Sequence, residues 1–365
     1  MSFNVKNLVP AYAIHPGEML RDELEARDIK QNDFAKLIGY KPTQLNEILK
    51  GKRDINADFA LLIGQALEIN PEFWMGLQAQ HDLDKVKIEE KTKSRLESIS
   101  VWNMCKDFIA VSYLKKKGII SGDPLEDIPK IKTLYGVSNV EQFPSIYASR
   151  GHFRKSTKLE TNTLNLFAWT KIVAQKAQEI EVKKFNHEKK DELVDKLKDV
   201  LKENKKTTFK VESILSDYGI KLIIEERPDK CAIDAYSFWS NGKPSIGMTL
   251  RHKRIDNFAF NLFHELGHIH LHLVNNPTIG FIDIGKDSVD YKNSKEEKDA
   301  NSFASENLVD KNAWIEFKKA NPIFTDIKIK QFASKQNVHP AVVIGKIGDE
   351  LKIYLKTSIS KELNN

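Results

Sequence analysis

Residues 16–80 carry apolar side chains at the spacing of short amphipathic helices. Positions three and four apart share one face of a helix, so each set predicts one buried stripe. The sets are Met19, Leu20 and Leu24, then Phe34, Leu37 and Ile38, then Leu45, Ile48 and Leu49. Gly39, Gly51 and Pro71 separate the helices, because glycine and proline interrupt helical structure. The pattern predicts a small all-α domain over residues 1–88.

Residues 89–210 give a less regular pattern. Helical patches at 102–114 and 193–201 alternate with loops rich in proline and glycine, such as 122–129. The lysine- and glutamate-rich run 181–206 has the composition of an exposed helix. We therefore expect a helical linker region here.

From residue 219 the apolar spacing changes from that of helices to that of strands. Short strands are predicted at 220–224, 235–239 and 245–250, with Asn241-Gly242 as a tight turn between the last two. Helices are then predicted at about 254–274, 295–309 and 325–355. Strands followed by helices indicate an α+β domain over residues 211–365 and an α+β multidomain chain overall.

The composition suits a folded protein that stays inside the cell. Of the 365 residues, 41% are hydrophobic and 30% are charged. The N-terminus lacks the apolar segment of a signal peptide, and no run of about 18 apolar residues occurs. Cys105 and Cys231 are the only cysteines, too few for a disulfide framework or a four-cysteine zinc site. We expect a cytoplasmic protein with no membrane partner.

The segment His264-Glu265-Leu266-Gly267-His268 lies within an apolar-periodic stretch. Histidines four apart on a helix face the same way and together suit Zn²⁺. Glu265 between them is placed to act as general base toward a zinc-activated water. His270 and His272 are expected to face other directions and to be packing or surface residues.

A catalytic zinc needs a third protein ligand and one open position. Glu297 is the candidate, because the small residues Ala300 and Ala304 on its helix would allow close packing against the histidine helix. The alternative is a capping box, in which Ser294 and Glu297 cap the start of that helix. Two neighbouring acids compete for the same role, Glu296 and Asp299.

The predicted strand that precedes the histidine helix contains Ser245, Ile246 and Gly247. If it is an edge strand beside the zinc, it would bind a peptide substrate by strand addition. The alternative is an ordinary strand inside the sheet.

Gln31, Ala35, Gly39 and Leu45 have the spacing of a helix-turn-helix, with a small crossing residue, a glycine turn and an apolar anchor. Within residues 27–53, seven residues are basic and three acidic. The recognition helix would be 42–50, with side chains meeting bases and phosphates. The DNA-contact candidates are Gln31, Lys41, Thr43, Gln44, Asn46, Lys52 and Arg53. A helical bundle with a solvated polar face is the alternative.

The C-terminal motifs resemble the ImmA/IrrE metallopeptidase family. They are Ser237-Phe-Trp-Ser-Asn-Gly-Lys-Pro-Ser-Ile246, Phe258-Ala-Phe-Asn-Leu-Phe-His-Glu-Leu-Gly-His268 and Glu297-xx-Ala300-xx-Phe303-Ala304. The resemblance covers about 215–350. It implies a gluzincin-like fold that cleaves transcriptional repressors, zinc ligands His264, His268 and Glu297, and Glu265 as base. The similar stretch after Val338 makes His339 a candidate for an oxyanion or substrate contact.

The N-terminal motifs resemble HigA-type antitoxins of the lambda-repressor-like (XRE) class. They are Ile14-His-Pro-Gly-Glu-Met-Leu-Arg-Asp-Glu-Leu24, Ile48-Leu-Lys-Gly-Lys-Arg53 and Pro71-Glu-Phe-Trp-Met-Gly-Leu-Gln78. The resemblance covers about 10–88. It implies binding to operator DNA as a homodimer, and it raises the question of a toxin partner.

Together these features predict a DNA-binding transcriptional regulator with zinc metallo-endopeptidase activity. Its substrate would be a repressor, an antitoxin or the chain itself. The rival hypothesis is a non-enzymatic antitoxin-like repressor whose zincin-like domain senses a ligand or metal. Hydrolysis of a small amide is a third option. The intact Glu265 favours the enzyme, because a purely structural site needs no base between its histidines.

Overall fold

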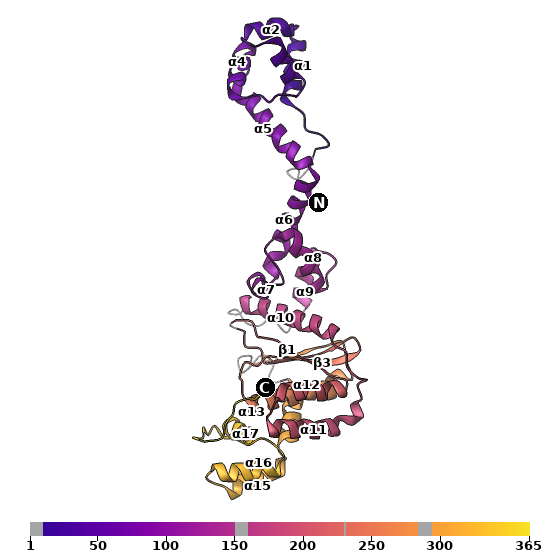
Figure 1. Ribbon diagram of the computed structural model, residues 1–365, viewed down its shortest axis with the longest axis vertical. Coiled ribbons are helices and arrows are strands. Elements are labelled where there is room, and N and C mark those ends of the chain that lie inside the picture. Colours follow the sequence, from indigo (N-terminus) through magenta and orange to yellow (C-terminus); the bar gives the residue numbers. More distant parts are fainter. Residues whose placement is uncertain (1–9, 150–159, 230, 284–293) are drawn as a thin grey trace. The chain divides into compact units, whose positions relative to one another are not determined.

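The computed structural model describes residues 10–149, 160–229, 231–283 and 294–365, which fall into two compact units (Figure 1). The first unit is Met1–Met104 with Asp123–Ile128, and the second is Cys105–Gly122 with Pro129–Asn365. The expected linker region 89–210 is therefore shared between the two units. The α+β multidomain fold class is confirmed by a helical first unit and a sheet-containing second unit.

The first unit is built from short helices around one apolar core. They are α1 (Pro16–Ala26), α2 (Gln31–Leu37), α3 (Pro42–Leu49), α4 (Ala57–Leu67), α5 (Pro71–Ile88) and α6 (Glu90–Cys105). The core holds Leu20, Leu24, Phe34, Leu45, Ile48 and Leu49 among others. Two residues expected in the buried stripes, Met19 and Leu37, are instead exposed. The helical spacing was right, but the buried stripe is narrower than the apolar one.

The second unit begins with helices and continues into the sheet. The helices before the sheet are α7 (Val111–Lys116), α8 (Pro124–Tyr135, which starts in the first unit), α9 (Phe143–Ser149), α10 (Glu160–Glu179), α11 (Lys190–Glu203) and α12 (Thr207–Asp217). Those after it are α13 (Ile255–His268), α14 (Lys295–Leu308), α15 (Lys311–Ala320), α16 (Asp326–Lys335) and α17 (Pro340–Leu351). A π-helical turn, Ile269–Leu273, extends α13. Within the described residues, no helix combines the length and apolar character needed to cross a membrane.

The sheet contains β1 (Lys221–Ile224), β2 (Ala235–Ser240), β3 (Lys243–Met248) and β4 (Phe281–Asp283). Its order is β1-β3-β2-β4, with β1 parallel to β3 and the other pairs antiparallel. Asn241 and Gly242 have φ values of 50° and 71°, so both residues of the turn between β2 and β3 are left-handed. This matches the tight hairpin turn that the sequence predicted, because both central residues of such a turn need positive φ.

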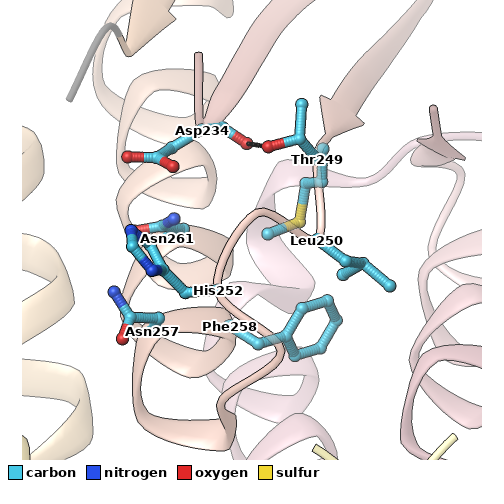
Figure 2. Close-up of a pocket in the computed structure, with 8 residues that line it drawn as sticks. Asp234, Thr249, Leu250, His252, Asn257, Phe258 and Asn261 are labelled. Atoms are coloured by element: carbon cyan, nitrogen blue, oxygen red, sulfur yellow. Dashed lines mark hydrogen bonds between the residues drawn. The ribbon is translucent and has the colours of Figure 1, made fainter. Parts of the chain in front are cut away.

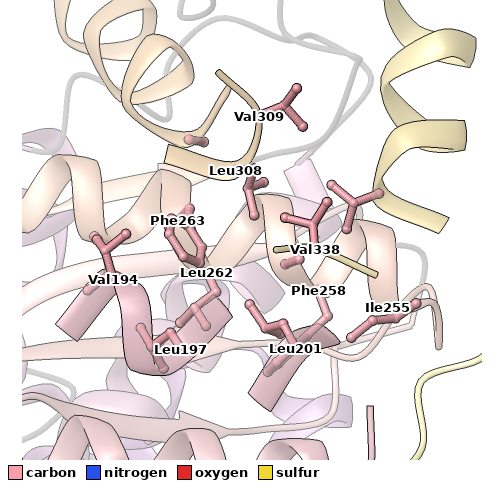
Figure 3. Close-up of a cluster of buried hydrophobic side chains, with 14 of the residues drawn as sticks. Val194, Leu197, Leu201, Ile255, Phe258, Leu262, Phe263, Leu308, Val309 and Val338 are labelled. Carbon is pink, nitrogen blue, oxygen red and sulfur yellow. The ribbon is translucent and has the colours of Figure 1, made fainter. Parts of the chain in front are cut away.

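Helices cover both faces of this sheet. A Cβ added at Gly247 would lie 2.5 Å from Val173 of α10, so this face of β3 packs tightly against α10. The alternate residues Ile246 and Met248 point the other way, into the core that α13 shares. Figure 3 shows part of that core, where Leu197 and Leu201 of α11 meet Phe258 and Leu262 of α13. The sheet is the middle layer of this unit.

Of the two alternatives for residues 245–247, the structure shows the ordinary strand inside the sheet and contradicts the edge strand. β3 pairs with β1 on one side and β2 on the other, so its backbone has no free edge for a peptide. Ser245, Ile246 and Gly247 are all buried between the helical layers. They cannot bind a substrate by strand addition, because the neighbouring strands already use their backbone groups.

Candidate metal centre and helix-turn-helix surface

Two helices bring three predicted residues into one buried cluster. His264 and His268 come from α13, and Glu297 comes from the first turn of α14. One donor atom from each lies within 4.8 Å of the others. The small residues allow this approach: a Cβ at Gly267 would lie only 3.0 Å from the Cα of Ala300. The close packing expected of the α14 helix is present.

The separations between donor atoms fit a tetrahedral ion. The two Nε2 atoms are 3.0 Å apart. The Glu297 oxygens lie 3.4 Å from His264 Nε2 and 3.2 Å from His268 Nε2. A tetrahedral zinc with ligands at roughly 2.0–2.1 Å holds neighbouring donor atoms about 3.3–3.4 Å apart. Two imidazoles and a carboxylate also match the ligand chemistry of zinc.

The local structure of α14 directs Glu297 toward the histidines. Ser294 is the N-cap, and its Oγ accepts the backbone N–H of Glu297 at 3.2 Å. The carboxylate of Glu297 faces the imidazoles instead of completing a capping box. Of the competing acids, Glu296 is exposed to solvent, while Asp299 lies 3.9 Å from His272. The structure therefore groups only Glu297 with the two histidines among these three acids.

Glu265 lies against the cluster and is fully buried. Neither of its oxygens has a hydrogen-bond partner of good geometry. The Ser237 side chain on β2 favours the charged form of Glu265. Burial raises the pKa of Glu265 to about 8, while the neighbouring His264 opposes the shift. A cation close to this carboxylate favours its ionised, proton-accepting form.

The protonation of the clustered residues must change when a metal binds. Burial raises the energy of ionised Glu297, but hydrogen bonds from His264 and His268 outweigh it and lower the pKa of Glu297. Burial lowers the pKa of His264, but Glu297, Glu265 and Asp283 outweigh that and raise it. Both histidines must be neutral to bind a metal, so binding has to displace a proton and weakens as the pH falls.

Asn301 is a functional neighbour that the sequence reasoning missed. It lies one turn after Glu297 on α14, and its Oδ1 is 3.1 Å from His264 Nδ1. A carbonyl oxygen there accepts the Nδ1–H and leaves Nε2 free to face the cluster. The four-residue spacing from Glu297 was the available signal, because such residues share a helix face.

The expectation that His270 and His272 face away from the cluster is correct for His270 and wrong for His272. His270 is a packing residue, buried against Phe303 with its Nδ1 3.1 Å from His187 Nδ1. His272, however, faces the cluster side of the helix, with its Nδ1 3.2 Å from His268 Nδ1. The four-residue spacing from His268 already indicated a shared face.

His339 is the N-cap of α17, where its Nδ1 accepts the backbone N–H of Ala341 at 3.2 Å. It lies near Asp256, at the first turn of α13, and the cluster histidines lie at that helix's other end. This places its imidazole in a structural role at a helix start. The structure does not group His339 with the three clustered residues, and the expected oxyanion or substrate contact stays a prediction.

A hollow lies along the histidine helix toward its N-terminus (Figure 2). Asn257 and Asn261 line it and share the face of α13 that carries His264, because they precede it by seven and three residues. The remaining lining residues are Asp234, Met248, Thr249, Leu250, His252 and Phe258. Asp234 also donates its backbone N–H to Asp283, whose carboxylate acts on His264. The hollow and the cluster are thus both formed in part by α13, and Asn261 lies one turn before His264.

The first unit has the geometry of a helix-turn-helix. Ala35 and Leu45 are buried, and Gly39 makes the turn between α2 and α3 with φ +72°. A Cβ at Gly17 would lie 1.9 Å from the carbonyl oxygen of Ile48, so α1 also crosses α3 closely. These contacts fix α3 on the bundle with its polar face outward.

Most of the predicted DNA-contact side chains are available on that surface. The exposed ones are Gln31, Lys41, Thr43, Asn46, Lys52 and Arg53. Gln44 is half-buried, and its Oε1 accepts the backbone N–H of Lys41 at 3.3 Å. Part of its hydrogen-bonding capacity is therefore used to cap α3.

Two family models match the chain. One describes a helix-turn-helix and covers residues 20–74. The other describes an IrrE N-terminal-like domain, peptidase family M78, and covers residues 216–342. The first match contains α2 and α3, and the second contains the sheet, α13 and α14.

Two curated proteins and a solved antitoxin structure are each similar to about a quarter of this chain or less. Virulence-associated protein I of Dichelobacter nodosus is 35% identical over 95 residues, 26% of this chain and 83% of that protein. Virulence-associated protein A' of the same organism is 37% identical over 73 residues, 20% of this chain. The chain spans just under two thirds, 64%, of that second relative. The structure of the Pseudomonas aeruginosa antitoxin HigA with the higBA promoter is 33% identical, covering 22% of this chain and 89% of that one, with TM-score 0.21.

Proposed function

We propose that this chain is a transcriptional regulator with zinc endopeptidase activity. It belongs to the helix-turn-helix family through residues 20–74 and to the IrrE N-terminal-like peptidase family through residues 216–342. The observation that carries the proposal is the set of donor separations in the buried cluster. These are 3.0, 3.4 and 3.2 Å among His264, His268 and Glu297. Three protein ligands leave a fourth position for chemistry, as in catalytic zinc sites.

The roles of the chain's own residues follow from their places. When bound, zinc supplies a Lewis acid that brings the pKa of a water molecule to about 7. Glu265 accepts the proton of the attacking water and passes it to the leaving amine, since it is buried beside His264. Asn301 holds the His264 ring by its Nδ1. Burial of His264, His268 and Glu297 limits competition from bulk water for their donor atoms.

A peptide fits the surroundings better than a small amide. Asn257 and Asn261 precede His264 on one face of α13 (Figure 2), and their side-chain amides can pair with backbone groups of an extended chain. Phe281, on the outermost strand among the described residues, stacks on His268 with ring centroids 4.2 Å apart. We propose a protein substrate, namely a repressor, an antitoxin or this chain itself.

The first unit would bind operator DNA. The exposed Thr43 and Asn46 lie on α3, the second helix of the motif, with Lys52 and Arg53 just beyond it. Such a helix enters the major groove, and nearby cations hold phosphates. The Pseudomonas aeruginosa antitoxin HigA, which is 33% identical to part of this chain, has been solved with the higBA promoter. We propose that the chain binds operator DNA as a homodimer and that it also has a toxin partner.

The decisive experiment replaces the base. Glu265→Gln keeps the size of the side chain but removes its proton-accepting charge, and general base catalysis contributes about 10²–10⁴-fold to rate. We expect the variant to bind zinc and operator DNA as the wild type does while proteolysis of the partner repressor is lost. Glu296→Gln removes an exposed carboxylate beside Glu297 and serves as the matched control.

Fragments and operator output would be followed in cells for all three proteins. Equal cleavage by wild type and Glu265→Gln would refute the peptidase proposal. If neither cleaves and regulation persists, the chain is a non-enzymatic repressor whose zincin-like unit acts as a sensor.

A further inference from the structure

We propose that His272 and Asp299 are positioning residues for the metal centre: His272 accepts the Nδ1–H of His268, and Asp299 holds His272 in the form that can accept it. The inference rests on the proposed zinc site and extends it beyond the ligands. Its basis is a row of three neighbouring side chains, His268, His272 and Asp299. His268 Nδ1 lies 3.2 Å from His272 Nδ1, and His272 Nε2 lies 3.9 Å from Asp299 Oδ2.

The positions of the protons follow from valence. His268 turns its Nε2 toward the cluster, 3.0 Å from His264 Nε2 and 3.2 Å from Glu297. A nitrogen that binds a metal carries no proton, and neutral imidazole has one N–H. The proton of His268 is therefore on Nδ1 and must be donated. The atom in reach is His272 Nδ1, which must then be the unprotonated nitrogen of its own ring.

Asp299 favours that arrangement. If Nδ1 of His272 accepts, its proton is on Nε2, the nitrogen that faces the Asp299 carboxylate. A carboxylate favours the N–H at the nearer nitrogen and so disfavours the tautomer in which two N–H groups would meet between the rings. Asp299 comes from α14, the same helix that provides Glu297 and Asn301. One helix thus supplies a ligand and orients both histidines.

The fold holds His272 in this place. It lies in the π-helical turn Ile269–Leu273, and such turns are frequent at functional sites. Its ring packs against Phe281, 5.3 Å between centroids, and Phe281 also stacks on His268. The side chain is 13% exposed, so water competes little for its Nδ1. The neighbouring His270 turns away toward Phe303 and His187 and takes no part.

The test measures zinc affinity of the full chain by competition with a chelator. His272→Phe keeps an aromatic ring but removes the acceptor, and loss of an outer partner costs about 10–100-fold in metal affinity. His272→Gln restores an acceptor oxygen and is expected to recover most of that loss. Asp299→Asn should weaken binding less than His272→Phe does, because its contact is long. His270→Phe, a ring replacement on the same turn, is the control and should bind zinc like the wild type.

A second readout reports the tautomer directly. Long-range ¹H–¹⁵N spectra of the zinc-loaded chain, labelled at histidine, should show His272 protonated on Nε2 and His268 on Nδ1, with the His272 signals identified by their absence in His272→Phe. Wild-type affinity in His272→Phe, or a proton on Nδ1 of His272, overturns the proposal. Both readouts are independent of proteolysis. If the chain binds zinc but cleaves no protein, the peptidase proposal is refuted, while the proposed roles of His272 and Asp299 are unaffected. A wild type that binds no zinc overturns both.

Discussion

Gly267→Ala tests whether the close approach of α13 and α14 sets the metal geometry. The new Cβ would lie 3.0 Å from Ala300 Cα, 3.1 Å from Phe303 Cβ and 3.3 Å from the Ala300 carbonyl oxygen. Carbon atoms prefer roughly 3.5–4.0 Å, so α14 must move by about half an ångström. Glu297 lies one turn earlier on that helix, and metal–ligand distances tolerate only about 0.2 Å.

The expected results follow from these distances. Overpacking costs about 1–3 kcal/mol, and replacing a helical glycine by alanine returns about 1 kcal/mol. The chain should therefore remain folded with a modestly lower Tm, while its zinc affinity falls about 10-fold, the lower end for disturbed ligand support. A large fall in zinc affinity with only a small fall in Tm would distinguish a disturbed metal site from general destabilisation.

Gly348→Ala is the matched control in the same unit. Gly348 lies on α17, and its added Cβ would meet only the Ile353 carbonyl oxygen at 3.8 Å. This variant should gain up to about 1 kcal/mol and bind zinc normally. Thermal unfolding and chelator competition on the three proteins give the comparison. If Gly267→Ala binds zinc as tightly as Gly348→Ala, the helix contact does not control the site.

The other predictions concern ligands, DNA and pH. A double variant His264→Ala, His268→Ala should lose zinc in metal analysis, and full occupancy there would disprove the site. Asn46→Ala should reduce discrimination between operator and random DNA in gel shifts more than Gln44→Ala, whose side chain also caps α3; equal discrimination by both variants and the wild type would move recognition elsewhere. Burial opposes ionisation of Glu225, but Lys117 and Lys176 outweigh burial and lower the pKa of Glu225 below its usual 4.5. The ionised carboxylate therefore stabilises the fold fully above pH 4.5, and this stabilisation is lost as the pH falls through the lowered pKa. Glu225→Gln should therefore lower the Tm at pH 7 and converge with the wild type in acid; a pH-independent difference would contradict the ion pair.

Several features were predictable because they depend on residues close together in the chain. Histidines four apart must share a face of any helix, so the orientation of His264 and His268 followed from their spacing. Asn241-Gly242 predicted a hairpin because both residues tolerate positive φ, and both adopt it. Ala35 and Gly39 likewise predicted the crossing and turn of the first unit. His272 belonged to this class too, and its direction was misjudged.

What the sequence determined by itself was the set of elements and the chemistry they carry, since both depend on local spacing and side-chain type. It could not determine which elements become neighbours. The place of β3 in the middle of the sheet depends on its pairing with β1, whose partner residues lie about two dozen positions away. The choice of Glu297 over Glu296 and Asp299 depends on how α14 is rotated against Gly267. Such contacts arise only when separate elements pack into one core, because packing, and not propensity, sets the distance between side chains that are remote in the chain.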